Sequence, residues 1–199
     1  MEIYAIRHAQ STYNKWAYKR IYTPWLWSTS DPMIEDAPLS DKGIHQAKKL
    51  HHTIKELREK VQLIICSPLS RAIHTMQIAF PDANCRIIIT PLVRERGDKL
   101  CDKGTPLPLL QEKYPQYEYM HFNSDIWWSS DPNPPHEFQK ESKESLHFRQ
   151  QELIEFLKDR SETIVVVITH GQFIKTLTGK RTQISNCGIR KFRLSEISR

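Results

Sequence analysis

The segment Thr163–Thr169 reads Thr-Ile-Val-Val-Val-Ile-Thr, and every residue in it is β-branched. Branching at Cβ restricts the side-chain rotamers and favours the pleated surface of a strand over a helix. The segment lacks alternation between polar and apolar positions, which is typical of a strand buried on both faces of a parallel sheet. A chain that contains such a strand needs helices to cover both faces of its sheet.

Shorter segments of strand character alternate with helical segments along the rest of the chain. The other predicted strands are Ile3–Ile6, Val61–Cys66, Arg86–Thr90 and Asn186–Leu194. Four helices are predicted: Leu39–Lys60, one that begins at Ser67-Pro68, Glu141–Asp159 and Gly171–Thr178. Ser40 or Asp41 can cap the first of them. This order predicts an α/β fold of three layers, with a mainly parallel sheet flanked by helices and right-handed crossovers.

One stretch departs from that alternation. Residues 96–140 are rich in Pro, Trp, Tyr and charged residues and lack a clear period, apart from a short helix near Leu107–Lys113. Long irregular stretches in compact domains are often active-site lids or binding loops. We therefore expect one domain over residues 1–199, with an insertion or lid at about 96–140.

The composition restricts where the chain acts and what it binds. Hydrophobic residues make up 39% and charged residues 26% of the 199 residues, an ordinary globular balance. No apolar run approaches the roughly 20 residues of a membrane span. The start, Met1 followed by Glu2 and a short strand, is too acidic and too short for a signal peptide. We expect a cytoplasmic protein that does not enter membranes.

The charge favours an anionic ligand. The net charge is +6 and the pI is about 9.1, which suits a phosphorylated metabolite, a phosphoprotein or a nucleic acid. The basic residues are scattered and no nucleic-acid-binding motif accompanies them, so nucleic acid is the weakest of the three. The cysteines form no C-x-x-C pair and no zinc-finger spacing, and we expect Cys66 and Cys187 to be buried, reduced thiols.

Polar clusters follow four of the predicted strands. They are Arg7-His8, Ser67–Arg71, Arg94-Glu95-Arg96 and His170-Gly171. In an open α/β sheet, ligands bind beyond the carboxyl ends of the strands, so we expect these clusters to converge on one cleft. Arginine matches phosphate oxygens with a planar fork of donors, neutral imidazole is a nucleophile, and a carboxylic acid can protonate a leaving oxygen. The combination predicts a site that binds and attacks a phosphoryl group.

The ordered motifs resemble those of the histidine phosphatase superfamily, also called the phosphoglycerate mutase-like fold. The matching segments are Ile6-Arg7-His8-Ala9-Gln10-Ser11-Thr12-Tyr13-Asn14, Leu39-Ser40-Asp41-Lys42-Gly43 with Gln46-Ala47, Ser67-Pro68-Leu69-Ser70-Arg71-Ala72 with Thr75, Glu95 after Pro91-Leu92, and Thr169-His170-Gly171. The resemblance runs from residue 3 to about residue 194.

The resemblance implies a role for each polar residue of the cleft. His8 would attack phosphorus and become phosphohistidine, and Glu95 would protonate the leaving group and then activate water. The groups expected to bind the phosphoryl oxygens are Arg7, Arg71, His170 and, as a helper, Asn14. No metal and no cofactor is expected, because the cationic side chains take the part of a metal. The implied activity is a phosphatase acting on a phosphorylated small molecule or phosphoprotein.

Departures from the family pattern leave alternatives open. Ala9 stands where the family usually has glycine, and R-H-A-Q is similar to one branch, in which a C-D-x-G stretch such as Cys101–Gly104 also occurs. Gln172-Phe173 stands where phosphoglycerate mutases typically carry Asn-Ser, which favours hydrolysis over mutase activity. After the phosphatase and the mutase, the third hypothesis is a catalytically silent module that binds phosphorylated ligands.

Substrate specificity is the least determined property. Four tryptophans lie in the two irregular segments: Trp25, Trp27, Trp127 and Trp128. They either fold over the cleft and contact the substrate or form a small core of their own beneath a long loop. The sequence leaves that choice open, together with the substrate and the oligomeric state.

Overall fold

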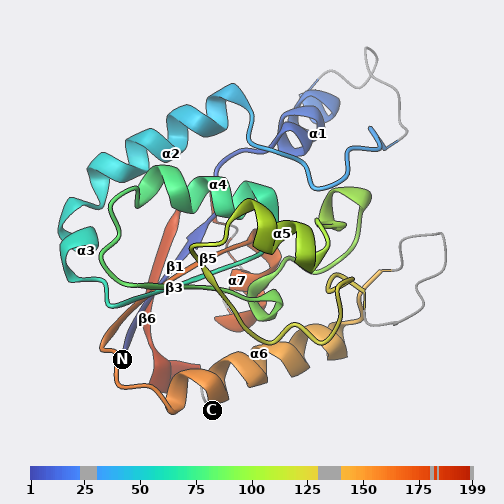
Figure 1. Cartoon of the computed structure of the whole chain (residues 1–199). Helices are drawn as coiled ribbons and strands as arrows, with labels where there is room; N and C mark the ends of the chain where they lie inside the picture. Colours follow the sequence, from blue (N-terminus) through green and yellow to red (C-terminus); the bar gives the residue numbers. More distant parts are fainter. Residues whose placement is uncertain (23–30, 130–139, 180–181, 183, 198–199) are drawn as a thin grey trace.

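The computed structural model describes residues 1–22, 31–129, 140–179, 182 and 184–197. A six-stranded sheet lies between two layers of helices, with strand order β4-β3-β2-β5-β1-β6 (Figure 1). The strands are β1 (Glu2–Arg7), β2 (Leu63–Cys66), β3 (Arg86–Ile89), β4 (Glu118–Tyr119), β5 (Ile164–Thr169) and β6 (Ile189–Arg193). The predicted fold class, a three-layer α/β fold with a mainly parallel sheet, is confirmed.

The helices cover the two faces of this sheet unequally. Those of the described residues are α1 (Thr12–Tyr22), α2 (Asp41–Thr53), α3 (Lys55–Lys60), α4 (Ser70–Ala79), α5 (Leu107–Lys113), α6 (Lys143–Lys158) and α7 (Gly171–Leu177). In Figure 1, α2, α3 and α4 lie above the sheet, and α6 lies below it. Short 3₁₀ turns occur at Pro91–Val93, Leu100–Asp102 and Leu194–Glu196.

Strand pairing brings the carboxyl ends of the central strands to one edge. β5 pairs in parallel with β1 on one side and β2 on the other, and Arg7 is level with Thr169. β2 pairs in parallel with β3, and β6 is the antiparallel strand, joined to β1. The residues that follow β1, β2 and β5 therefore emerge side by side.

Alternation along the strands builds two separate cores. In β5, Val165 and Val167 pack with α6 and α7, whereas Val166 and Ile168 pack with α2 and α4. β2 divides in the same way, because successive side chains of a strand point to opposite faces. Burial on both faces explains why Thr163–Thr169 contains no polar alternation.

The helix predicted over Leu39–Lys60 is interrupted in the structure. Ser40 is its N-cap, and its side chain accepts a hydrogen bond from the N–H of Gly43 at 3.1 Å. The helix ends at Thr53, Ile54 is its C-cap (φ −101°, ψ 24°), and α3 begins at the next residue. Thr53 and Ile54 are β-branched and are therefore weak helix formers, which places the break there.

The helix after β2 begins later than the sequence indicates. We expected Pro68 at its first position, but α4 starts at Ser70. The carboxylate of Asp36 accepts hydrogen bonds from both the N–H and the hydroxyl of Ser70, at 2.8 and 2.7 Å. This cap comes from a distant segment, so local sequence patterns could not reveal it.

The helix α1 was absent from the prediction. Ser11 and Asn14 cap its start reciprocally, since the Ser11 hydroxyl accepts from the Asn14 N–H and the Asn14 side-chain oxygen accepts from the Ser11 N–H. This is the geometry of a capping box with Asn in the usual Glu position. The Ser-x-x-Asn spacing is the signal that could have located the helix.

The stretch 96–129 contains more regular structure than the sequence indicated. The expected short helix is present as α5, and β4 pairs in parallel with β3, which extends the sheet. Trp127 is buried in the core on the α4 side of the sheet, and its indole N–H donates to the carbonyl of Thr105 at 2.8 Å. Part of this stretch is thus fixed to the sheet and the core.

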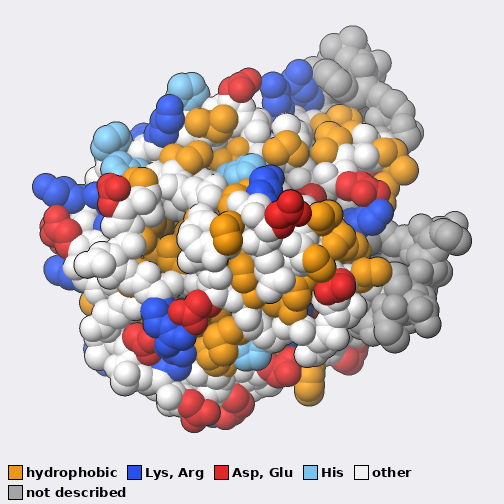
Figure 2. Space-filling model, in the orientation of Figure 1, with side chains coloured by type: hydrophobic (Ala, Val, Ile, Leu, Met, Phe, Trp, Pro, Cys, Tyr) orange, Lys and Arg blue, Asp and Glu red, His pale blue; other side chains and the backbone are white. Residues whose placement is uncertain are grey.

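The surface carries mixed charge. On the face shown in Figure 2, Lys and Arg side chains are interspersed with Asp and Glu.

Within the part of the chain that the structure describes, no helix has both the length and the apolar character needed to span a bilayer.

Candidate active site

A cleft of about 160 Å³ lies at the carboxyl edge of β1 and β2. It contains five of the six residues singled out from the sequence. Its lining includes Arg7, His8, Asn14, Arg71 and Glu95. The sixth, His170, follows β5, and its ring centroid lies 5.0 Å from that of His8, with the ring planes inclined by 55°. The structure therefore brings all six together.

His8 is held in one tautomer. Its Nδ1 lies 2.6 Å from the carbonyl oxygen of Ala9. A carbonyl only accepts, so Nδ1 carries the proton and Nε2 keeps its lone pair. Burial lowers the pKa of His8 well below its usual value, and the positive charges of Arg71 and Arg7 lower it further. The ring is therefore neutral at physiological pH.

Ala9 fits the position where the family usually has glycine. It does not belong to the described residues with positive φ, so no left-handed backbone is required there. Its N–H donates to the hydroxyl of Thr75 at 3.0 Å. The extra methyl group is fully buried, and the carbonyl that orients His8 is retained.

His170 is fully buried, and its Nε2 lies 2.8 Å from the hydroxyl oxygen of Ser67. That hydroxyl also accepts a hydrogen bond from the N–H of Leu69 at 3.3 Å. Nδ1 of His170 has no hydrogen-bond partner among the described residues. Burial lowers the pKa of His170 well below its usual value, and neighbouring Arg71 adds to this effect. His170 thus keeps one buried ring nitrogen without a hydrogen-bond partner among the described residues, next to the ring of His8.

Arg7 also offers an unused donor. Its Nη1 donates to the carbonyl of Ile184 at 2.7 Å, while Nε is buried and has no partner among the described residues. A Cβ atom at Gly171 would lie 3.3 Å from this Nε. Glycine at 171 therefore leaves room for the guanidinium to pack against the start of α7.

Arg71 is fixed by an ion pair. Its Nη2 lies 2.7 Å from a carboxylate oxygen of Asp102, and its Nη1 donates to the carbonyl of Cys101 at 2.5 Å. Burial alone would lower the pKa of Arg71, but Asp102, with smaller contributions from Cys101, Asp36 and Glu95, outweighs it and raises the pKa. Arg71 is a permanent, oriented cation, and Asp102 is the residue that orients it.

Asn14 lies at the first turn of α1 and lines the cleft. Its side-chain oxygen accepts from the N–H of Ser11 and from the side-chain amide of Asn186, both at 3.3 Å. Asn186 also donates to the carbonyl of His8 at 2.9 Å. The sequence did not single out Asn186, which joins the His8 segment to the start of α1.

Glu95 faces the start of α7. Its carboxylate accepts the N–H groups of Gln172 and Phe173, each at 3.3 Å, and that of Arg96 at 3.0 Å. Burial raises the pKa of Glu95, and Asp102 adds to the rise, while these N–H donors and Arg71 oppose it. The carboxyl group is therefore easier to protonate than an exposed one.

A buried charge cluster holds the segment that carries Glu95. The carboxylate of Glu141 forms an ion pair with Arg94 at 2.8 Å and accepts two hydrogen bonds from Arg149 at 2.8 and 2.7 Å. Arg149 also donates to the carbonyls of Leu92, Arg94 and Glu95. The sequence motifs do not predict this cluster. The available signal was a charged residue, Arg149, at helical spacing between the buried residues Leu146 and Leu153.

The tryptophans separate into two groups. Trp25 and Trp27 lie outside the described residues. Trp127 is buried, and its ring packs against that of Trp128 with centroids 5.4 Å apart. A Cβ atom at Gly104 would lie 2.1 Å from the Trp127 ring, so glycine there permits the contact. Neither Trp127 nor Trp128 lines the cleft around His8.

A parallel sheet with two neutral imidazoles and two guanidinium groups at its carboxyl edge is suited to phosphoryl chemistry. The family model described as "Histidine phosphatase superfamily (branch 1)" matches residues 3–199. The chain belongs to this superfamily.

Curated relatives carry both phosphatase and mutase names. A protein of Schizosaccharomyces pombe named "Probable phosphatase" is 28% identical over 177 residues, covering 87% of this chain and 75% of the relative. A "Phosphoglycerate mutase-like protein" of Arabidopsis thaliana is 24% identical over 208 residues, covering 88% of this chain and 72% of its own length.

Solved structures share the fold at low identity. The ecdysone phosphate phosphatase of Bombix mori, solved with tungstate, has a TM-score of 0.59 and 15% identity, covering 96% of this chain and 88% of that one. A mycobacterial glucosyl-3-phosphoglycerate phosphatase, solved with VO3, has a TM-score of 0.58 and 18% identity, covering 96% of this chain and 92% of that one. Membership of the superfamily supports a phosphatase or mutase type of activity.

Proposed function

We propose that this protein is a phosphatase that hydrolyses phosphomonoesters through a phosphohistidine on His8, without a metal ion. The observation that carries the proposal is the contact between Nδ1 of His8 and the Ala9 carbonyl. It directs the lone pair of Nε2 away from that carbonyl, and the lowered pKa of His8 keeps this lone pair free. A neutral, oriented imidazole is a competent nucleophile.

In the first step, Nε2 of His8 attacks phosphorus and forms the N–P bond while the bond from phosphorus to the leaving oxygen breaks. Protonated Glu95 gives its proton to the leaving oxygen. Arg7 and Arg71 donate to the phosphoryl oxygens as charge spreads over them. His170, through its unpartnered Nδ1, and Asn14 complete the set of donors.

In the second step, water attacks phosphorus opposite Nε2, and the N–P bond breaks as the new P–O bond forms. Glu95, now a carboxylate, takes a proton from the water and returns to its starting state. The rise in the pKa of Glu95 supports this alternation, because it brings the acid and base forms closer in free energy. The products are inorganic phosphate and the dephosphorylated alcohol, phenol or protein.

The test is turnover of p-nitrophenyl phosphate by the full chain in EDTA, together with trapping of the intermediate. Phosphohistidine survives alkali and is lost in acid, so an alkaline quench followed by peptide mass spectrometry should locate phosphate on His8. Dependence of the turnover on added metal, or phosphate found on another residue, would contradict the proposal. Conversion of 3-phosphoglycerate to 2-phosphoglycerate would indicate a mutase, and phosphate binding without turnover a silent module.

A further inference from the structure

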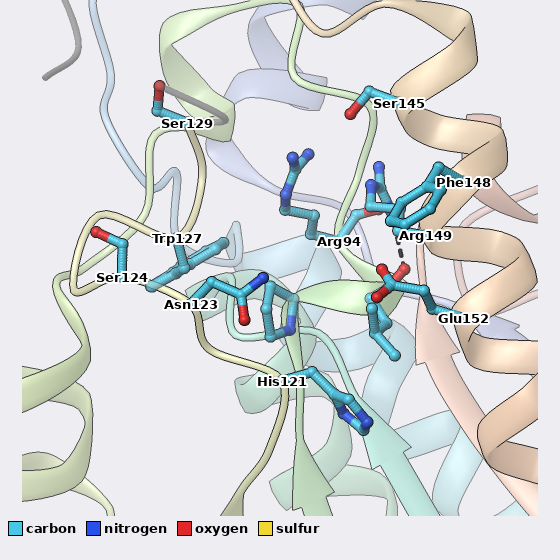
Figure 3. A pocket seen from close by; sticks show the side chains of 12 residues that line it. Arg94, His121, Asn123, Ser124, Trp127, Ser129, Ser145, Phe148, Arg149 and Glu152 are labelled. Carbon is cyan, nitrogen blue, oxygen red and sulfur yellow. Dashed lines mark hydrogen bonds between the residues drawn. The ribbon is translucent and has the colours of Figure 1, made fainter. Parts of the chain in front are cut away.

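A second cavity, of about 360 Å³, adjoins the segment that carries Glu95 (Figure 3). It has no lining residue in common with the cleft around His8. Helix α6 forms one wall with Ser145, Phe148, Arg149 and Glu152, and the loop after β4 forms the opposite wall. The proposed hydrolysis assigns no role to this cavity, although Arg94 and the segment Pro91-Leu92, which the sequence motifs include, contribute to its lining.

The buried charges beside the cavity are not balanced. Arg94 and Arg149 share the single carboxylate of Glu141, and the exposed fractions of the three side chains are only 8%, 7% and 4%. Two buried cations against one anion leave one positive charge in excess. Uncompensated buried charge is costly, and an anion in the cavity would offset it.

Arg94 is the cation available to such an anion. All three nitrogens of the Arg149 guanidinium already donate to Glu141 or to backbone carbonyls. Arg94 gives Nη2 to Glu141, and Nη1 makes only a long contact of 3.3 Å with the carbonyl of Glu95. In Figure 3 its guanidinium extends into the middle of the cavity. Burial and the nearby Arg149 lower the pKa of Arg94 to about 10, so it is still a cation at neutral pH.

The other titratable groups of the lining do not cancel this charge. His121 is neutral, because burial lowers its pKa. Glu152 lines the cavity but is exposed, where water and salt screen its charge. Asp102 also acts on Arg94, but it lies outside the lining and is paired with Arg71. The net field inside therefore favours an anion at Arg94.

The rest of the lining is suited to a flat apolar group. Trp127 and Phe148 stand on opposite sides of the cavity in Figure 3. The indole N–H of Trp127 is already bonded to Thr105, so the ring offers apolar surface only. Phe148 is 67% exposed, and a ligand ring against it would remove apolar surface from water.

We propose that this cavity binds a small aromatic anion, with its carboxylate or phosphate on Arg94 and its ring between Trp127 and Phe148. The site is separate from the proposed phosphatase centre and does not depend on it. A ligand there would contact Arg94, the residue that precedes Glu95.

The direct test is to soak crystals with 4-iodobenzoate and locate iodine by its anomalous signal. The His8→Ala protein serves alongside the wild type, because this site should fill equally in both. The expected result is iodine between Trp127 and Phe148, with the carboxylate within hydrogen-bond distance of Arg94. Iodine found solely in the His8 cleft, or at no site, would overturn the proposal, whatever the enzyme assays show.

Titration calorimetry with the same probe tests the individual contacts. Arg94→Met leaves Arg149 and Glu141 as a balanced pair, so the protein should fold, and binding should weaken by about 10-fold or more through loss of a charge-assisted hydrogen bond. Arg94→Lys should retain most of the binding. Unchanged binding in Arg94→Met would refute the role of Arg94.

A surface variant keeps the test independent of folding. Phe148→Ala should weaken binding about 5-fold through loss of ring contact. The matched control is Leu109→Ala on α5, which removes a 53% exposed apolar side chain outside the cavity and should leave binding unchanged. Equal effects of these two variants would count against a ring site at Phe148.

Discussion

The imidazole rings of His8 and His170 lie with their centroids 5.0 Å apart, and both side chains are buried. Two ionised rings at this distance would repel each other, and burial holds both in the neutral form. The neutral state of both rings would allow His8 to act as the proposed nucleophile while His170 remains a hydrogen-bonding neighbour.

Removal of either ring should have a different consequence. His8→Ala should lower kcat for p-nitrophenyl phosphate by at least about 10³-fold and abolish the trapped phosphohistidine. His170→Ala should lower kcat by about 10²- to 10³-fold, as loss of one transition-state donor does, while phosphohistidine still forms. His52→Ala, an exposed histidine of α2, is the control. Comparable phosphohistidine yields from the His8→Ala protein and the wild type would exclude His8 as the nucleophile.

The pH profile should be set by His8 and Glu95. In the proposed mechanism the active form has a neutral His8 and a protonated Glu95. Activity should rise as pH increases through the lowered pKa of His8 and fall as pH increases through the raised pKa of Glu95. An acidic optimum is therefore expected for kcat/KM with an alkyl phosphate, whose leaving group needs the proton.

Glu95→Gln tests the falling limb of that profile. An alkyl phosphate should lose about 10²-fold or more in kcat/KM, because amide nitrogen cannot supply the proton. An aryl phosphate with a good leaving group should lose less in the first step. Equal losses for both substrates, or an unchanged alkaline limb in the variant, would argue that another group is the acid.

Ser67 should act as a positioning residue through His170. Its hydroxyl contacts Nε2 of His170 at 2.8 Å, so Ser67→Ala removes the ring's hydrogen-bond partner. We expect kcat to fall by about 10-fold and the ¹⁵N NMR signals of His170 to report a changed tautomer mixture, with an unchanged circular dichroism spectrum. An unaltered His170 spectrum would show that Ser67 does not set its tautomer.

Glu141 should be a major determinant of stability. Glu141→Gln leaves Arg94 and Arg149 without a countercharge in a buried site, and such losses cost about 3–5 kcal/mol. Urea unfolding measures this. Glu155→Gln on α6 breaks an exposed pair with Lys158 and should change stability by no more than about 0.5 kcal/mol. Similar losses in the two variants would contradict the importance of burial.

The same ion pairs predict acid sensitivity. Arg149 and Arg94 outweigh burial and lower the pKa of Glu141 to about 2 from its ordinary value of 4.5. A lowered carboxyl pKa contributes stability that is complete above the ordinary value and is lost as pH falls toward the folded value. Stability should therefore decline between about pH 4.5 and pH 2, and the pH dependence should be weaker in Glu141→Gln. A decline of the same steepness in that variant would mean that other carboxyl groups cause it.

The central strands and the polar residues after them were predictable because each signal is local. β5 is a continuous β-branched run, Arg7 is the last residue of β1, and His8 and His170 directly follow β1 and β5. Parallel pairing then aligns those ends, so a one-dimensional pattern is enough to indicate where they meet.

The remaining features depend on partners that are distant in sequence. Asp36 caps α4 from another segment, β4 is a strand of two residues, and Glu141 meets Arg94 only after α6 docks on the sheet. Each involves one or two residues without a period of its own. Helix α1 differs, because the Ser11 and Asn14 residues of its reciprocal cap are a local signal that the sequence itself contains.

Helix α2 has a consequence for the His8 segment although none of its residues lines the cleft. The carbonyl oxygen of Gln10 accepts the N–H of Ser40 at 2.9 Å, and the N–H of Gln10 donates to the side chain of Gln46 at 2.9 Å. A Cβ atom at Gly43 would lie 2.0 Å from that carbonyl oxygen. The start of this helix therefore fixes the backbone two residues after His8, and a single methyl group at residue 43, which does not line the cleft, would force the two segments apart.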